Sequence, residues 1–438
     1  MSALAPVRPG PGIVRPVEAG PVTTLRFTTS GSVDDGKSTL IGRLLLDSKV
    51  LLEDQLAAVA KTTARRGGSQ ALDLSLFTDG LTAEREQGIT IDVAWRYFAT
   101  PRRRFIIADT PGHEQYTRNM VTGASTASLS IVLADCERGL TTQTRRHAAI
   151  ASLLAIPHVI LAVNKMDLVG YDGAAFEAIA AEFAAIARSL GLAKITAIPV
   201  SALAGDMVVE RGSNLDWYRG PTLLEALETA SPVDPVTELR FPVQLVSRSR
   251  FGTNGDLRGY LGRVESGAVA VGDTVVAWPA GQEAKVADIA TLEGTLPEAG
   301  TGRSVTIVLD RQVDIARGDV LTHRRDAPLV ARKFSARLAW LDRDALAIGR
   351  RYWLKQGTKT VRATIDEVLH RLDLATLQPD AAATTLEFND LGLARLTVAS
   401  LLVVDPYHAN RHTGSFVLID DATHHTVAAG MIEAVAGG

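Results

Sequence analysis

The segment GSVDDGKST at residues 31–39 restricts the fold more than any other stretch of the chain. It has the pattern G-x-x-x-x-G-K-[ST], and it lies between a β-rich run, TLRFTT, and a run of helical period, STLIGRLLLDS. In that strand–turn–helix setting the pattern predicts a phosphate-binding loop, because its glycines let backbone N–H groups converge on phosphate oxygens at the positive end of the helix. We expect Lys37 to reach the β- and γ-phosphates of a nucleotide and Ser38 to bind Mg2+ through its hydroxyl.

Short β-rich runs alternate with helical stretches from residue 25 to about residue 231, as in RFIIAD, LSIVLAD, HVILAVN and FEAIAAEFAAIARSLG. This alternation predicts an α/β P-loop domain with a mostly parallel sheet and helices on both faces. The segment VAWRYFATPRRRFIIAD resembles two strands joined by a turn, which predicts one antiparallel edge strand. After ASPVDPVTE the sequence pattern changes to short β-rich runs separated by glycine, which predicts two all-β barrel domains.

These changes in sequence pattern predict the domain organisation. We expect a flexible Pro- and Gly-rich tail at residues 1–22, the P-loop domain at 23–235, the second domain, a β-barrel, at 236–328 and the third, also a β-barrel, at 329–438. The 46 basic and 49 acidic side chains nearly balance, so no nucleic-acid partner is expected. No run reaches the roughly 18 apolar residues that a membrane helix needs, and Cys136 is the single cysteine. We therefore expect a soluble, cytoplasmic protein with no membrane partner.

A second motif, NKMD at residues 164–167, follows the run HVILAV and identifies the expected base. Asp167 can accept hydrogen bonds from guanine N1 and from the 2-amino group, a pairing that adenine does not offer. Ser201 and Ala202, in PVSAL at the end of a later strand, are expected to meet guanine O6 through their backbone N–H groups. The three motifs together predict a guanine nucleotide, GTP.

The segment DTPGH at residues 109–113 also ends a strand. We expect Asp109 to hold Mg2+ through a water, the Gly112 amide to sense the γ-phosphate, and His113 to position the attacking water. Thr90, in EREQGITID, is expected to bind Mg2+ when its loop closes. The charged residues before it, Glu84 to Glu86, fit a solvated charge run equally well.

The predicted site thus contains three overlapping groups of residues. The catalytic group is Lys37, Thr90 and His113, and the metal ligands are Ser38, Thr90 and Asp109. The nucleotide-binding residues are Gly31, Ser32, Val33, Asp34, Asp35, Gly36, Lys37, Ser38, Thr39, Asp109, Thr110, Pro111, Gly112, His113, Asn164, Lys165, Met166, Asp167, Ser201, Ala202 and Leu203.

With these motifs in place, the chain resembles the translation-factor-like GTPases and, among them, the GTPase subunits of heterodimeric bacterial sulfate adenylyltransferases. Asp35 stands where elongation factors usually carry histidine. The segments DGLTAEREQGITIDVAWRYFAT, LRGYLGRVESG, YWLKQGTKTV and DPYHANRHTGSFVLIDDATHHTVAAGMI look like this subunit family. Departures from the family pattern are the glycine-rich SRSRFGTNGDLRGY, DCERGL, and the pair His424 and His425.

The resemblance implies that this chain hydrolyses GTP while a small ATP-using subunit makes adenylyl sulfate and pyrophosphate from ATP and sulfate. Relatives fused to an adenylyl sulfate kinase would carry a second phosphate loop, and the sequence has none, since GTKT at residue 357 lacks the Gly-Lys pair. The kinase activity is therefore not predicted. The alternative is an elongation-factor-type GTPase that delivers aminoacyl-tRNA, which would have the same fold.

Overall fold

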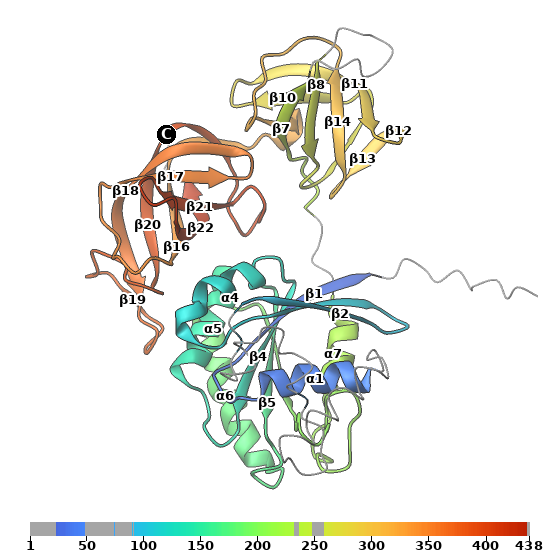
Figure 1. Cartoon of the computed structure of the whole chain (residues 1–438), viewed down its shortest axis with the longest axis vertical. Helices are drawn as coiled ribbons and strands as arrows, with labels where there is room; N and C mark the ends of the chain where they lie inside the picture. Colours follow the sequence, from blue (N-terminus) through green and yellow to red (C-terminus); the bar gives the residue numbers. More distant parts are fainter. Residues whose placement is uncertain are drawn as a thin grey trace, which may run out of the picture.

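The computed structural model describes residues 23–48, 74, 90, 92–231, 236–247 and 258–435 (Figure 1). The predicted tail, the charged residues at 84–86 and most of the glycine-rich loop after residue 247 lie outside the described residues. Within this described part, an α/β domain is followed along the chain by two antiparallel barrels, which confirms the predicted fold class. None of the helices described combines the length and the apolar character that crossing a bilayer requires.

The sheet of the α/β domain is built from the β-rich runs that the sequence predicts. Its strands lie in the order β2 (Ala94–Ala99), β3 (Arg104–Asp109), β1 (Thr24–Ser30), β4 (Leu129–Asp135), β5 (His158–Asn164) and β6 (Lys194–Pro199). All neighbouring pairs are parallel except β2 and β3, so the predicted antiparallel edge strand is confirmed. Every residue of β4 and β5 is buried, as expected of central parallel strands covered on both faces.

Helices cover both faces of this sheet. They are α1 (Lys37–Asp47), α4 (Thr117–Ala124), α5 (Thr142–Leu153), α6 (Gly173–Ser189) and α7 (Leu223–Thr229), with a 3-10 turn, η2 (Glu114–Tyr116), before α4. Figure 1 shows α1 and α7 on one side of the sheet and α4, α5 and α6 on the other. Because the chain returns through a helix after each parallel strand, the loops that follow the strands gather at one edge of the sheet.

The first barrel has a closed main sheet and a separate two-stranded sheet. Its strands are β7 (Phe241–Ser247), β8 (Gly259–Arg263), β9 (Ala268–Ala270), β10 (Thr274–Trp278), β11 (Gln282–Thr291), β12 (Gly294–Thr295), β13 (Glu298–Gly300), β14 (Ser304–Leu309) and β15 (Val320–His323). The main sheet runs β10-β15-β7-β8-β14-β11-β12, and β10 also pairs with β11, which closes it. Closure removes the exposed edges that an open antiparallel sheet would present.

The second barrel begins after a 3-10 turn, η3 (Arg324–Asp326), and closes in the same way. Its strands are β16 (Leu329–Trp340), β17 (Arg351–Gln356), β18 (Lys359–Leu372), β19 (Pro379–Asp380), β20 (Leu391–Val404), β21 (Ser415–Asp420) and β22 (Thr426–Val435). They lie in the order β17-β21-β22-β16-β20-β18-β19, with β17 also paired to β18. The domain boundaries given above stay a prediction.

Buried polar contacts hold the second barrel to both other parts. The Arg240 guanidinium, just before β7, binds the Asp405 carboxylate through two hydrogen bonds of 2.8 Å. Arg411 donates to the backbone carbonyls of Ala127 and Ala155 in the α/β domain. The second barrel is therefore in contact with the loops before β4 and after α5.

Candidate functional site

The phosphate loop connects β1 to α1 through a turn that only glycine can complete. Gly36 caps α1 with a left-handed φ of 85°, and a Cβ there would lie 2.4 Å from Asn164 Nδ2. No side chain caps the first amides of α1, so these donors are available to an anion. The loop and the helix therefore have the geometry that the sequence predicts for phosphate binding.

Asp35 is buried inside this loop, with a side chain 1% exposed. Its Oδ2 accepts a 2.6 Å hydrogen bond from the Ser32 amide, whereas its Oδ1 is buried without a hydrogen-bond partner. Burial raises the pKa of Asp35 to about 6, against the Ser32 hydrogen bond, which lowers it. This carboxylate shapes the loop from within and titrates well above an ordinary aspartate.

Lys37 brings the predicted phosphate and metal residues together. Its side chain is 8% exposed, and its Nζ donates to Thr90 Oγ1 over 2.8 Å and forms an ion pair with Asp109. Two of the three predicted metal ligands thus contact the same ammonium, and the third, Ser38, lies next to Lys37 on α1. Hydroxyl and carboxylate oxygens are the ligands that Mg2+ prefers, so this donor set fits that ion.

A metal cage made of protein alone is not present among the described residues. There, no group of three or more His, Cys, Asp or Glu side chains is arranged to hold a metal ion.

The predicted base-binding residues lie at the ends of β5 and β6. Asn164 is buried at the end of β5, and its Oδ1 accepts a 3.0 Å hydrogen bond from the Ala202 amide. Its Nδ2 donates to the Asp35 carbonyl over 2.8 Å. One carboxamide therefore joins the phosphate loop to the loop that carries Ser201, Ala202 and the exposed Leu203.

The neighbouring residues of NKMD are held by the same two loops. Ser201 Oγ donates to Asp167 Oδ1 over 2.6 Å, and Met166 is completely buried. Lys165 Nζ forms a 2.7 Å ion pair with Asp135. The Ser201 amide donates to the Asp206 carbonyl. The predicted contact of the Ser201 and Ala202 amides with guanine O6 stays a prediction.

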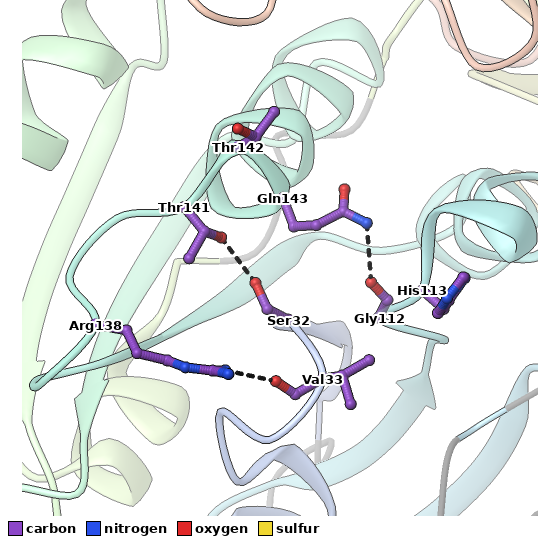
Figure 2. Close-up of a pocket in the computed structure, with 8 residues that line it drawn as sticks. All are labelled: Ser32, Val33, Gly112, His113, Arg138, Thr141, Thr142 and Gln143. Atoms are coloured by element: carbon purple, nitrogen blue, oxygen red, sulfur yellow. Dashed lines mark hydrogen bonds between the residues drawn. The ribbon is translucent and has the colours of Figure 1, made fainter. Parts of the chain in front are cut away.

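Gly112 lies against the phosphate loop and lines a cavity beside it. A Cβ at Gly112 would be 2.1 Å from the Gly31 carbonyl oxygen, so this approach requires glycine. His113 follows it and lines a cavity of about 540 Å3. Figure 2 shows its ring on the far side of Gly112 from Ser32, and its Nδ1 accepts a 3.3 Å hydrogen bond from the Gln115 amide. Its role in positioning water stays a prediction.

Four residues that line this cavity, Arg138, Thr141, Thr142 and Gln143, were missing from the predicted site, and three of them bond to residues within it. Thr141 Oγ1 is 2.8 Å from Ser32 Oγ, Gln143 Nε2 donates to the Gly112 carbonyl over 3.4 Å, and Arg138 Nη1 donates to the Val33 carbonyl over 3.0 Å (Figure 2). They lie between the end of β4 and the first turn of α5. The sequence did carry a signal, because β4 is expected beside β1 and the residues after both strands share one edge of the sheet.

Comparisons with known proteins agree with this arrangement. The family model of the elongation factor Tu GTP binding domain matches residues 23–233, and that of the GTP-eEF1A C-terminal domain-like family matches residues 333–433. Sulfate adenylyltransferase subunit 1 of Chromobacterium violaceum is 51% identical over 414 residues, which cover 94% of this chain and 86% of that protein.

Two further relatives are longer than this chain. Bifunctional enzyme NodQ of Rhizobium sp. (strain N33) is 51% identical over 93% of this chain and 63% of its own length. Bifunctional enzyme CysN/CysC of Mycobacterium tuberculosis (strain ATCC 25618 / H37Rv) is 51% identical over 94% of this chain and 67% of its own length. The chain thus spans 63 to 65% of the length of the Rhizobium NodQ relatives.

Proposed function

Because the chain belongs to the family of sulfate adenylyltransferase subunit 1, we propose that it binds GTP with Mg2+ and hydrolyses the GTP within an enzyme that activates sulfate. A small ATP-using subunit would make adenylyl sulfate and pyrophosphate from ATP and sulfate. The observation that carries the proposal is the Asn164 carboxamide, which binds the phosphate loop and the Ser201–Leu203 loop at once. This link supports a single site in which the phosphate loop would hold the triphosphate and the neighbouring loop the base.

Selection of guanine would rest on Asp167. Its carboxylate is anchored by Ser201 Oγ and has oxygens that match the N1 and 2-amino donors of guanine. Adenine would leave these half-buried acceptors without partners, and such mismatches discriminate between ligands. The elongation-factor alternative shares this pocket and the family models, but the subunit 1 relatives are 51% and 46% identical over 94% and 93% of this chain, which favours the sulfate-activating enzyme.

Ser38, Thr90 and Asp109 would hold the Mg2+ ion, which when bound neutralises charge on the β- and γ-phosphates. Lys37 contacts Thr90 and Asp109, so it would exchange part of this pairing for phosphate oxygens when GTP binds. The amides of the phosphate loop and of Gly112 would fix the γ-phosphate, and His113 would orient the water.

Coupling to the partner requires that the GTP-bound and GDP-bound forms of this chain differ in how they bind the partner. Formation of a sulfate–phosphate anhydride is uphill, so GTP hydrolysis can drive it only if the two nucleotide forms bind the partner's reaction states with different affinities. Thr90 and the residues from Asp109 to His113 would lie next to the γ-phosphate, and their rearrangement on hydrolysis would supply this difference.

The test is reconstitution with the small ATP-using subunit encoded in the same genome. We expect the two chains to co-purify, and we expect adenylyl sulfate formation from ATP and sulfate to rise when GTP is added but not when GDP is added. A Lys37→Ala chain in the same complex should remove the stimulation. If GTP has no effect on the wild-type complex, or if the chain takes up ATP as readily as GTP, the proposal is wrong.

A further inference from the structure

Arg138 reaches the phosphate loop from the turn between β4 and α5. Its Nη1 donates to the Val33 carbonyl over 3.0 Å, and it lines the same cavity as Gly112 and His113 (Figure 2). A guanidinium has five N–H donors, and this bond uses one of them. The side chain is therefore tethered beside the phosphate loop with donors left for another group.

A tight turn fixes the backbone that presents Arg138. Asp135 and Gly139 form an isolated β-bridge, and the Gly139 amide donates to the Asp135 carbonyl over 2.9 Å. Gly139 has a φ of 68°, a left-handed conformation that glycine adopts without strain. Arg138 thus projects from a short, closed loop rather than from a long one.

Asp135, three residues before Arg138, already has a basic partner. Asp135 forms an ion pair with Lys165 and accepts hydrogen bonds from the Glu137 and Arg138 amides. Although burial alone would raise the pKa of Asp135, these contacts hold it below its usual value. Asp135 therefore stays ionised and matched to Lys165, and it does not neutralise the Arg138 guanidinium.

Among the described residues Arg138 forms no ion pair, although its charge acts on the buried Asp35 carboxyl and opposes the rise in the pKa of that group. Lys37, the other cation at the phosphate loop, is paired with Asp109. An arginine without an ion-pair partner, held at a phosphate-binding loop, suits a phosphate group whose oxygens can take two N–H donors at once.

We propose that Arg138 contacts the terminal phosphate of bound GTP and stabilises the charge that develops on it during hydrolysis, as a catalytic residue supplied by the chain itself. This assignment rests on the proposed GTP hydrolysis. In that reaction the oxygen of water bonds to the γ-phosphorus, the bond from the γ-phosphorus to the β–γ bridging oxygen breaks, and the proton of water passes to the released phosphate. Arg138 keeps its own proton throughout, because arginine does not deprotonate in proteins.

The test compares the full chain with Arg138→Ala, Arg138→Lys and a control, Arg145→Ala. Arg145 lies on α5 and pairs with Glu182 away from the cavity. Single-turnover hydrolysis of GTP and the Kd of a fluorescent GTP analogue are measured for each chain. We expect Arg138→Ala to lower the hydrolysis rate on the order of 10²-fold while the Kd stays within about threefold of wild type.

Chemical rescue separates a catalytic role from a structural one. Millimolar guanidinium chloride should partly restore hydrolysis by Arg138→Ala and leave Arg145→Ala unchanged, and Arg138→Lys should keep an intermediate rate because a point charge replaces the planar fork. A hydrolysis rate for Arg138→Ala within about threefold of wild type, or an equal loss of GTP affinity and hydrolysis rate, would overturn the role of Arg138 and leave the proposed function standing. A wild-type chain that does not hydrolyse GTP would overturn the proposed function and the assignment with it.

Discussion

Asn164 donates a hydrogen bond from its Nδ2 to the Asp35 carbonyl over 2.8 Å, which ties the end of β5 to the phosphate loop. The same side chain accepts from the Ala202 amide. Removing it leaves two buried backbone groups unpaired, each at about 1 to 3 kcal/mol. We expect Asn164→Ala to weaken GTP binding at least about 100-fold by equilibrium titration. Asn214→Ala, which loses one bond to Asp206, is the control and should bind GTP almost normally.

Base selectivity should follow the group at position 167. In Asp167→Asn an amide donor replaces one carboxylate acceptor, so guanine loses a hydrogen bond and xanthine, which carries an oxygen in place of the 2-amino group, gains one. We expect affinity for GTP to fall and affinity for xanthosine triphosphate to rise, each on the order of 10²-fold in competition binding. Retained preference for GTP would mean that Asp167 does not contact the base.

Gly112 should tolerate no side chain. The added Cβ of Gly112→Ala would be 2.1 Å from the Gly31 carbonyl, so either the phosphate loop or the segment after β3 must move. We expect GTP hydrolysis to fall at least about tenfold while the chain stays folded by circular dichroism. Gly300→Ala is the matched control, because nothing lies within 4 Å of its added Cβ. Equal activity of the two variants would contradict the close approach.

The pH dependence of stability should carry the signature of Asp35. Burial raises its pKa to about 6 from an ordinary 3.8, so the folded chain holds this proton more tightly than the unfolded chain does. That stabilisation is complete below about pH 4 and is lost as the pH rises through 6. In urea denaturation, Asp35→Asn should therefore gain about 1 to 3 kcal/mol relative to wild type between pH 4 and pH 7. Parallel profiles for the two chains would rule out this contribution.

The buried pair of Arg240 and Asp405 should contribute far more to the free energy of unfolding than an exposed pair does. Their side chains are 6% and 10% exposed. Asp405→Ala leaves an unpaired guanidinium inside the contact between the barrels, and we expect a loss of about 3 to 5 kcal/mol in the free energy of unfolding. Glu367→Ala, which breaks the exposed pair with Arg395, should cost less than about 1 kcal/mol. Similar losses would show that the barrel contact is not held by this pair.

Much of the fold could be predicted because its signals are local. The phosphate loop has a fixed spacing between Gly31 and Ser38, and the uninterrupted apolar runs of β4 and β5 indicate buried parallel strands. The antiparallel strand β2 was predicted for the same reason, since a short turn at Pro101 leaves the chain no room to cross over.

The remaining features of the site depend on contacts between residues that are far apart in the sequence. Arg138 looks like an ordinary charge in DCERGL, and only the folded turn shows that it meets Val33, about one hundred residues earlier in the chain. The ion pair of Lys37 with Asp109 and the docking of Arg411 on two carbonyls likewise join residues with no shared local pattern. Motif spacing therefore predicts which residues would bind the ligand but not the groups that position them.

Helix α5 connects the nucleotide cavity to the second barrel. The residue before its first turn, Thr141, touches Ser32 of the phosphate loop, and beyond its last turn the Leu154 and Ala155 carbonyls accept from Tyr407 and Arg411. A helix of this length spans about 18 Å and resists compression along its axis. We therefore expect that a shift of the phosphate loop that moves Thr141 along the helix axis would be transmitted through α5 to the second barrel.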